Sequence, residues 1–184
     1  MPILLLHIAL IAIFGVILPW RKGLDFLDPV MISAYACIGM LFAAPASAAN
    51  CGGKRPQSLK EAVQRAWKAV LYGEGLAVIL LAAGILTVSY SRGRILVPQL
   101  DILGEAALLG FTGTVALALL AGWLTLRFSV SLARTGMRVI FLLLLLGFFF
   151  QSQRLPEIGL QGSLLALAVA ALALLLLRRE VHPQ

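Results

Sequence analysis

The sequence has little charge. Asp, Glu, Lys and Arg together make up 12% of its 184 residues, whereas 61% of the residues are hydrophobic. A domain that folds in water needs a much larger share of charged surface, so this composition excludes an ordinary soluble globular protein. In lipid, an α-helix satisfies its own backbone hydrogen bonds. The composition therefore predicts an all-α, polytopic transmembrane helix bundle in a single domain.

Cysteine and histidine are also scarce, with two of each in the chain. Cys37 and Cys51 form no C-x-x-C pair and have no histidine near them in the sequence, so we expect ordinary thiols and no metal site. The sequence contains no G-x-x-x-x-G-K-[ST], H-E-x-x-H or G-x-S-x-G motif. We therefore expect no enzyme activity and no cofactor, and any coupling to ATP requires a separate partner.

Six apolar segments reach or approach the roughly 17 to 25 residues that a helical span requires. They cover residues 2–20, 29–48, 71–90, 102–126, 130–150 and 159–177. The fifth segment reaches this length only if Arg134 and Arg138 extend their charged groups from one end of the span. The basic residues lie between the apolar segments, which favours contacts with lipid headgroups over a nucleic-acid surface.

The distribution of basic residues predicts the orientation. In the six-span arrangement, ten of the fifteen Lys and Arg residues fall on the side that holds both termini, and five fall on the other side. Because the more basic side normally faces the cytoplasm, we expect both termini to be cytoplasmic. The expected location is the inner membrane of a bacterium.

The longest segment between spans contains a predicted amphipathic helix at residues 58–70. Ser58 and Glu61 have the spacing of a capping box, which marks a helix start. One helical face is expected to carry Leu59, Val63, Ala66, Trp67 and Val70. The other carries the polar residues Lys60, Glu61, Gln64, Arg65 and Lys68. Two roles remain open: an anchor at the membrane surface, or a docking surface for a soluble partner.

The position of this helix, between the second and third of six predicted spans, is similar to that of the coupling helix in ABC-2-type export permeases. The resemblance is one of topology and includes no family motif. It implies that residues 58–70 contact a cytoplasmic ATPase subunit.

The fourth predicted span carries small residues at intervals of four. This spacing lets a second helix approach closely, within the chain or in another copy. The ladder consists of Ala106, Gly110, Thr114, Ala118 and Gly122. Thr114 can add a hydrogen bond to the contact. A less favoured alternative is a substrate groove at Thr112, Gly113 and Thr114.

Several polar residues fall inside or near the predicted spans, where ionisable groups are costly and often functional. Two interpretations are open for Glu74 and Glu105. Each acid can form an ion pair, Glu74 with Arg134 or Arg138 and Glu105 with Arg94 or Arg154. Alternatively, each is stabilised by the dipole of the first turns of its own helix. His7 is expected to make a hydrogen bond near the interface rather than to relay protons. The candidates are His7, Glu74, Glu105, Thr112, Thr114, Arg134 and Arg138.

These features favour a membrane-embedded subunit of a transport system. One version is an export permease with a separate cytoplasmic ATPase, and another is a substrate-binding membrane subunit of a vitamin-type uptake system. The alternative from a different class is a non-transporting accessory or assembly subunit of a larger membrane complex. The expected partners are membrane lipid, other membrane subunits or further copies of the chain, and the ATPase.

Overall fold

A computed structural model describes residues 56–93, 95, 100–129, 131–133, 135, 136, 139, 140, 143 and 159–181. Its helices are α4 (Leu59–Arg92), α5 (Leu100–Arg127) and α7 (Gly159–Val181). These ranges contain no strand, which confirms the all-helical prediction for the described part of the chain. The first two predicted spans, most of the fifth, and the candidates His7, Arg134 and Arg138 lie outside the described residues.

Helix α4 begins and ends at clear sequence signals. The Ser58 hydroxyl accepts a hydrogen bond from the Glu61 amide at 3.2 Å, as an N-cap residue does. At the other end Gly93 adopts a left-handed conformation with φ of 61°, and its N–H bonds the Tyr90 carbonyl at 3.2 Å. Glycine adopts this conformation without the steric cost of a side chain, which explains why the helix stops there.

Between these caps the helix runs without interruption for 34 residues. The sequence pattern predicted a separate amphipathic helix that ends at Val70 and a span that starts at Leu71. The structure corrects this boundary, because one helix covers both segments. The charge pattern changes near residue 70, but the sequence of α4 contains no proline, and its glycines Gly73, Gly75 and Gly84 lie inside the continuous helix.

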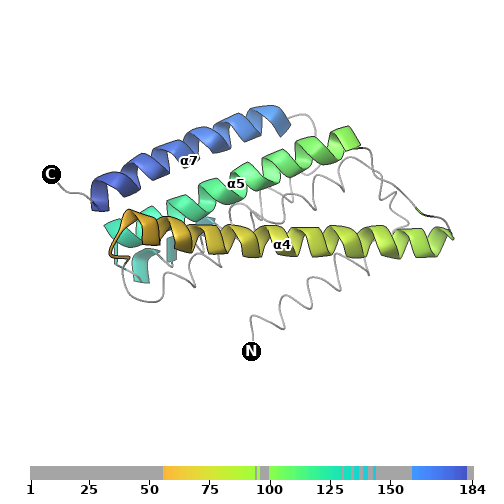
Figure 1. Cartoon of the computed structure of the whole chain (residues 1–184), viewed down its shortest axis with the longest axis horizontal. Helices are drawn as coiled ribbons and strands as arrows, with labels where there is room; N and C mark the ends of the chain where they lie inside the picture. The colour runs from red at the N-terminus through yellow and green to blue at the C-terminus, as the bar shows by residue number, and fades with distance from the viewer. Residues whose placement is uncertain are drawn as a thin grey trace.

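The three helices lie side by side with a defined direction (Figure 1). Helix α4 runs antiparallel to α5: Ala66, Ala69 and Val70 pack against Ala118, while Ala62 lies with Leu126. Helix α7 runs parallel to α5, because Gly159 lies beside Glu105 at one end and Leu177 lies beside Gly122 at the other. The predicted fifth span falls in the sequence between these two parallel helices, mostly outside the described residues.

Close approach between α5 and α7 depends on small side chains. A Cβ atom added at Gly162 would lie 2.8 Å from Leu109 Cδ1, so the glycine makes room for this leucine. Farther along, the Leu177 methyl groups lie 3.8 Å from the position of a Cβ at Gly122. Helices in lipid associate through such close packing, because burying apolar side chains there brings little hydrophobic gain.

Helix α4 also contacts its neighbours through small residues. Ala62, Ala66 and Ala69 are 2%, 6% and 0% exposed. By contrast Val63 and Trp67, which share the predicted apolar face with Ala66 and Val70, are 37% and 49% exposed. The part of α4 that packs in the bundle is thus centred on the alanines and leaves the bulky side chains outside.

All three helices are long and apolar enough to cross a membrane. Large hydrophobic side chains cover their outer surfaces, including Val78, Leu86, Leu165 and Leu175, each at least 59% exposed. In water such a surface would drive aggregation, whereas in a bilayer it contacts lipid. The described part is therefore that of a membrane protein.

The packing at Gly162 predicts a stability change. We expect Gly162→Val to lower the free energy of unfolding by about 1–3 kcal/mol, because the new side chain overlaps the position of Leu109. Thermal unfolding in mild detergent measures the effect. Gly75→Val is the matched control, since no described atom lies within 4 Å of a Cβ at that glycine. Equal losses in the two variants would contradict the proposed contact.

Candidate functional site

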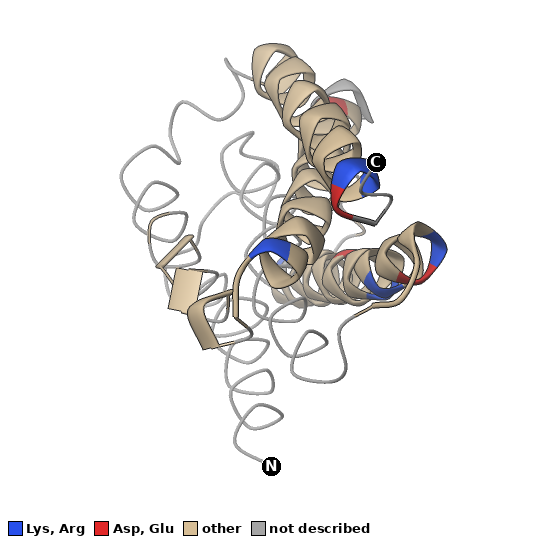
Figure 2. Ribbon diagram, turned by 90° about the vertical axis from the view of Figure 1, so that its left-hand side faces the viewer, with Lys and Arg blue, Asp and Glu red and all other residues tan. Residues whose placement is uncertain are grey.

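One end of the bundle gathers positive charge from all three helices. Ala62 of α4, Leu126 of α5 and Leu177 of α7 form one buried cluster, which brings the start of α4 to the ends of α5 and α7. Viewed from that side, basic residues lie at the ends of all three helices (Figure 2). We call this region the basic end and define it by Lys60, Glu61, Arg65, Lys68, Arg127, Arg178, Arg179 and Glu180.

Two ion pairs use both acids of the basic end. Arg65 Nη2 lies 2.6 Å from Glu61 Oε1, one helical turn away, and Arg127 Nη1 lies 3.5 Å from Glu180 Oε1 across the contact between α5 and α7. Six cations and two acids leave a net charge of four (6 − 2 = 4). Four cations have no ion pair within the described part of the chain: Lys60, Lys68, Arg178 and Arg179.

The exposed residues of α4 at the basic end form a stripe. Lys60, Gln64 and Lys68 recur every four residues, and all three are exposed. They span roughly 12 Å of the helix axis, on the side opposite Ala62 and Ala66. Of the five predicted docking residues, these three are therefore available to a partner, whereas Glu61 and Arg65 bind each other. We call Lys60, Gln64 and Lys68 the α4 stripe.

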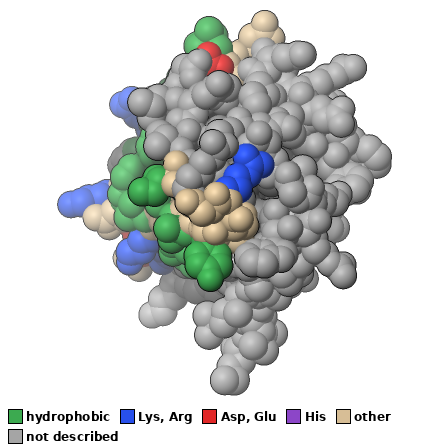
Figure 3. All heavy atoms as spheres, turned by 90° about the vertical axis from the view of Figure 1, so that its right-hand side faces the viewer, with side chains coloured by type: hydrophobic (Ala, Val, Ile, Leu, Met, Phe, Trp, Pro, Cys, Tyr) green, Lys and Arg blue, Asp and Glu red, His purple; other side chains and the backbone are tan. Residues whose placement is uncertain are grey.

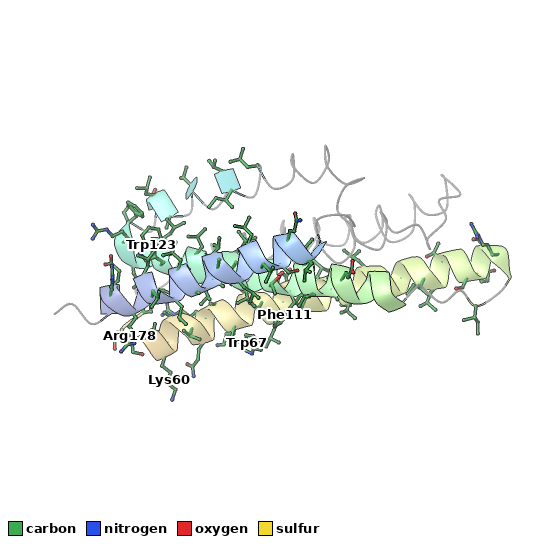
Figure 4. All side chains as sticks on the ribbon, turned by 90° about the horizontal axis from the view of Figure 1, so that it is seen from above. Lys60, Trp67, Phe111, Trp123 and Arg178 are labelled. Carbon is green, nitrogen blue, oxygen red and sulfur yellow. The ribbon has the colours of Figure 1, made fainter. Side chains whose placement is uncertain are left out.

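Trp67 marks the place where the apolar part of α4 begins. Its ring packs edge-on against Phe111 of α5, with centroids 6.4 Å apart, on the outer surface of the bundle (Figure 4). Tyr90, near the other end of α4, is 81% exposed. Tryptophan and tyrosine favour the two membrane interfaces, and the separation of these residues along the axis, roughly 35 Å, suits a bilayer. Lys60 and Gln64, which precede Trp67, then lie outside the hydrocarbon, and Lys68 lies at its boundary, where a lysine extends its charged group to the interface.

Glu61 stabilises the start of α4. Its Oε2 accepts a hydrogen bond of 2.9 Å from the backbone N–H of Gln57, one residue earlier than the capping-box pattern predicts. This bond, followed by the bond from Arg65, lowers the pKa of the Glu61 carboxyl below its ordinary value. The predicted capping role of Ser58 is also present, so both side chains fix the first turn.

The small-residue ladder on α5 faces two partners rather than one. Ala118 packs against α4, and Thr114 lies beside Glu74 of α4. Gly122 contacts Leu177 of α7. Gly110 is buried, and of Ala106 only the helical backbone is described. The ladder therefore lies along the seam where α4 and α7 both meet α5.

The hydroxyl groups of α5 and α7 bind the backbone of their own helices. Thr112 Oγ1 donates to the Leu108 carbonyl at 2.8 Å, Thr114 Oγ1 to the Gly110 carbonyl at 2.7 Å, and Ser163 Oγ to the Gly159 carbonyl at 2.8 Å. Thr112 and Thr114 also lie about 200° apart around the helix. They therefore do not line one face of the helix, which argues against the less favoured alternative of a substrate groove at Thr112, Gly113 and Thr114.

Glu74 lies in the middle of the contact between α4 and α5. Its carboxyl group is beside the hydroxyl of Thr114, a residue that is 0% exposed. Glu74 Oε1 is buried and, among the described residues, has no hydrogen-bond partner. Arg134 and Arg138, the cations expected to pair with Glu74, lie outside the described residues. The sequence analysis identified Glu74 and Thr114 as separate polar candidates but did not predict that they are neighbours.

Glu105 lies at the opposite end of the bundle. Its Cβ and Oε2 are 3.7 Å from the position of a Cβ at Gly159, the first residue of α7. A carboxylate at this place interacts favourably with the dipole of α7, whose own first turn contains no acid. The expected partners Arg94 and Arg154 are outside the described residues. Figure 3 views this end, where the described side chains facing the reader are mostly apolar.

Among the described residues, no group of three His, Cys, Asp or Glu side chains lies together as a metal site would require. No family model matches the chain, and no characterised protein or solved structure is significantly similar to it. The basic end and the Glu74 contact are therefore the features from which a function can be argued.

The capping bond of Glu61 predicts a pH dependence. Because the folded-state pKa is lowered, the stabilising contribution is complete above the ordinary value near 4.5 and is lost as the pH falls through the folded value. We expect protection of the amides of residues 59–62 from hydrogen exchange to fall in this acidic range. Glu61→Gln keeps an acceptor but cannot titrate, so in this variant the protection of these amides should not change with pH. If the variant loses protection over the same acidic range as the wild type, the assignment is contradicted.

Proposed function

We propose that this protein is a membrane-embedded subunit of a transport system and that the α4 stripe, at its basic end, docks a cytoplasmic ATPase subunit. The supporting observation is the α4 stripe, with Lys60, Gln64 and Lys68 exposed on a helix that is packed firmly against α5 on its other side. A stripe of this kind suits an acidic surface on a partner, because charge complementarity directs association and selects partners.

The continuity of α4 gives such docking a mechanical consequence. The predicted coupling helix and the third span are one helix, so a displacement of the α4 stripe moves the residues inside the membrane as well. The helix is roughly 51 Å long, whereas the hydrocarbon core is about 30 Å thick. The excess length is divided between the two ends of α4, and the part that precedes Trp67 extends beyond the hydrocarbon on the side of a soluble partner.

The accessory or assembly subunit remains the alternative from a different class. It is supported by two observations. The helices contact each other through small residues, and the hydroxyl groups of Thr112, Thr114 and Ser163 bind the backbone of their own helix rather than lining a polar passage. An uptake subunit of the vitamin type would also use an ATPase partner. Detection of such a partner therefore distinguishes both transport versions from the accessory role, but it does not distinguish the two transport versions from each other. The proposed orientation places the basic end in the cytoplasm of a bacterial cell.

The orientation predicts a labelling pattern. In a variant with Cys37 and Cys51 replaced by serine, we expect Lys60→Cys and Arg178→Cys to react with a membrane-impermeant maleimide only in inside-out vesicles. Arg92→Cys should react only in right-side-out vesicles, because Arg92 ends α4 at the opposite side. Leu165→Cys, on the lipid-facing surface of α7, is the unreactive control. Labelling of Lys60→Cys and Arg178→Cys from different sides would refute the shared basic end.

The docking surface predicts a charge-reversal effect. We expect Lys60→Glu/Lys68→Glu to reduce the ATPase activity that co-purifies with the tagged protein by about tenfold or more, a loss of ~1.4 kcal/mol in binding. Arg65 is left in place because it binds Glu61. Arg178→Glu/Arg179→Glu is the matched control at the same end, on α7, and should retain the partner.

Two outcomes count against the proposal. Equal loss in both variants would show a response to overall charge rather than docking on α4. If the wild-type protein co-purifies with no ATPase, or with a membrane complex that lacks one, the accessory role is favoured instead. Thermal unfolding of each variant distinguishes lost binding from lost folding.

A further inference from the structure

We infer that the end of α7 binds an anionic phospholipid of the adjacent leaflet, with the lipid phosphate held by Arg178 and Arg179 and the acyl chains lying along leucines of the same helix. The inference goes beyond the proposed function. It rests on α7 and on the depth of the basic end in the membrane, and it requires neither the ATPase nor the α4 stripe.

Arg178 and Arg179 are cations whose charge the described residues leave uncompensated. Both are exposed in the last turn of α7, where Figure 2 shows the basic residues of this helix. The neighbouring acid, Glu180, is paired with Arg127 of α5, and the other acid of the basic end is paired with Arg65. The dipole of α7 favours cations at this end, but it equals only about half a negative charge. Roughly one and a half positive charges therefore remain for an external anion.

The depth of the two arginines matches that of lipid phosphates. Leu177 of α7 packs in one cluster with Ala62 of α4, five residues before Trp67. The end of α7 thus lies roughly 7.5 Å beyond the level of Trp67, which marks the boundary of the hydrocarbon. The headgroup layer on each side of a bilayer is about 5 to 8 Å thick. A phosphate in this layer is therefore within reach of both guanidinium groups.

Deeper in the membrane, the surface of α7 next to the arginines is apolar and open. Leu174 lies four residues before Arg178, and Leu175 lies four residues before Arg179, so each leucine is one turn deeper on the same side of the helix. The leucines that continue these two sides, each at least 42% exposed, are Leu164, Leu165, Leu167, Leu172, Leu174 and Leu175. A phospholipid has its parts in the same order, with a charged headgroup and apolar chains beneath it.

The charges of the basic end favour a lipid with a net negative charge. A zwitterionic phospholipid carries an ammonium group beside its phosphate, and a nearby acid would stabilise that group. Both acids of the basic end are already in ion pairs, so the described residues there offer the ammonium group mainly repulsion. Phosphatidylglycerol has no such cation. Its phosphate also suits arginine, which can donate two parallel hydrogen bonds to phosphate oxygens.

Native mass spectrometry of the purified full-length protein in mild detergent tests the preference. Phosphatidylglycerol and phosphatidylcholine are added in equal amounts. We expect the first bound lipid to be phosphatidylglycerol by a factor of about five or more, the effect of one or more basic residues at a membrane surface. Arg178→Gln/Arg179→Gln should bind the two lipids equally. Thermal unfolding without added lipid shows that this variant is folded, as expected for two exposed side chains.

Lys60→Gln/Lys68→Gln is the matched control, because it removes the same charge at the same end of the bundle, from α4. It should keep the preference for phosphatidylglycerol. An equal loss in both variants would show a response to overall charge and overturn the site on α7. Displacement of the lipid by excess inorganic phosphate would show that a free anion occupies the arginines instead. Neither result depends on an ATPase, so each is independent of the docking experiment.

Photocrosslinking in bilayers locates the bound lipid. The probe is phosphatidylglycerol with a diazirine in one acyl chain, and mass spectrometry of the digested protein identifies the labelled residues. We expect adducts concentrated on residues 164–175 of α7, and we expect this concentration to be lost in Arg178→Gln/Arg179→Gln. A photoreactive phosphatidylcholine should label the exposed surfaces of the helices without this preference. If phosphatidylglycerol labels α4 and α7 alike, or still favours α7 without the arginines, the inference is wrong.

Discussion

In this bundle every polar group that enters the membrane must find a hydrogen-bond partner without help from water. The helices meet this requirement internally. Their backbones are bonded along each helix, and the hydroxyls of Thr87, Thr112, Thr114, Thr125 and Ser163 donate to carbonyls three or four residues earlier. Little hydrogen-bonding capacity is left to join one helix to another. Association must therefore come from contact area, and contact area requires that the backbones approach closely.

This constraint explains which faces are buried. Alanines line the side of α4 that packs on α5, and a glycine of α7 accommodates Leu109. The larger residues Val63 and Trp67 remain on the outside, near the level at which α4 enters the membrane. Against this background Glu74 is an exception, because its carboxyl group lies within a contact that is otherwise built from small residues.

The same constraint sets the limit of what the sequence predicts. Composition and segment length predict helices, and α5 and α7 cover the spans expected at residues 102–126 and 159–177. The capping residue Ser58 is also placed correctly. The side of α4 that packs on α5 could not be predicted, because large apolar residues face lipid as readily as protein and their periodicity does not distinguish the two. The contact between Glu74 and Thr114 depends on the register of two helices, which neither helix encodes alone.

Helix α4 connects the basic end to the interior of the bundle. Lys60 and Glu74 are fourteen residues apart on one uninterrupted helix, roughly 21 Å along its axis. The contact of Ala66, Ala69 and Val70 with Ala118 lies between them and holds α4 against α5. The small side chains that let these two backbones approach are therefore also the contact through which the proposed docking at the α4 stripe would act on the rest of the bundle.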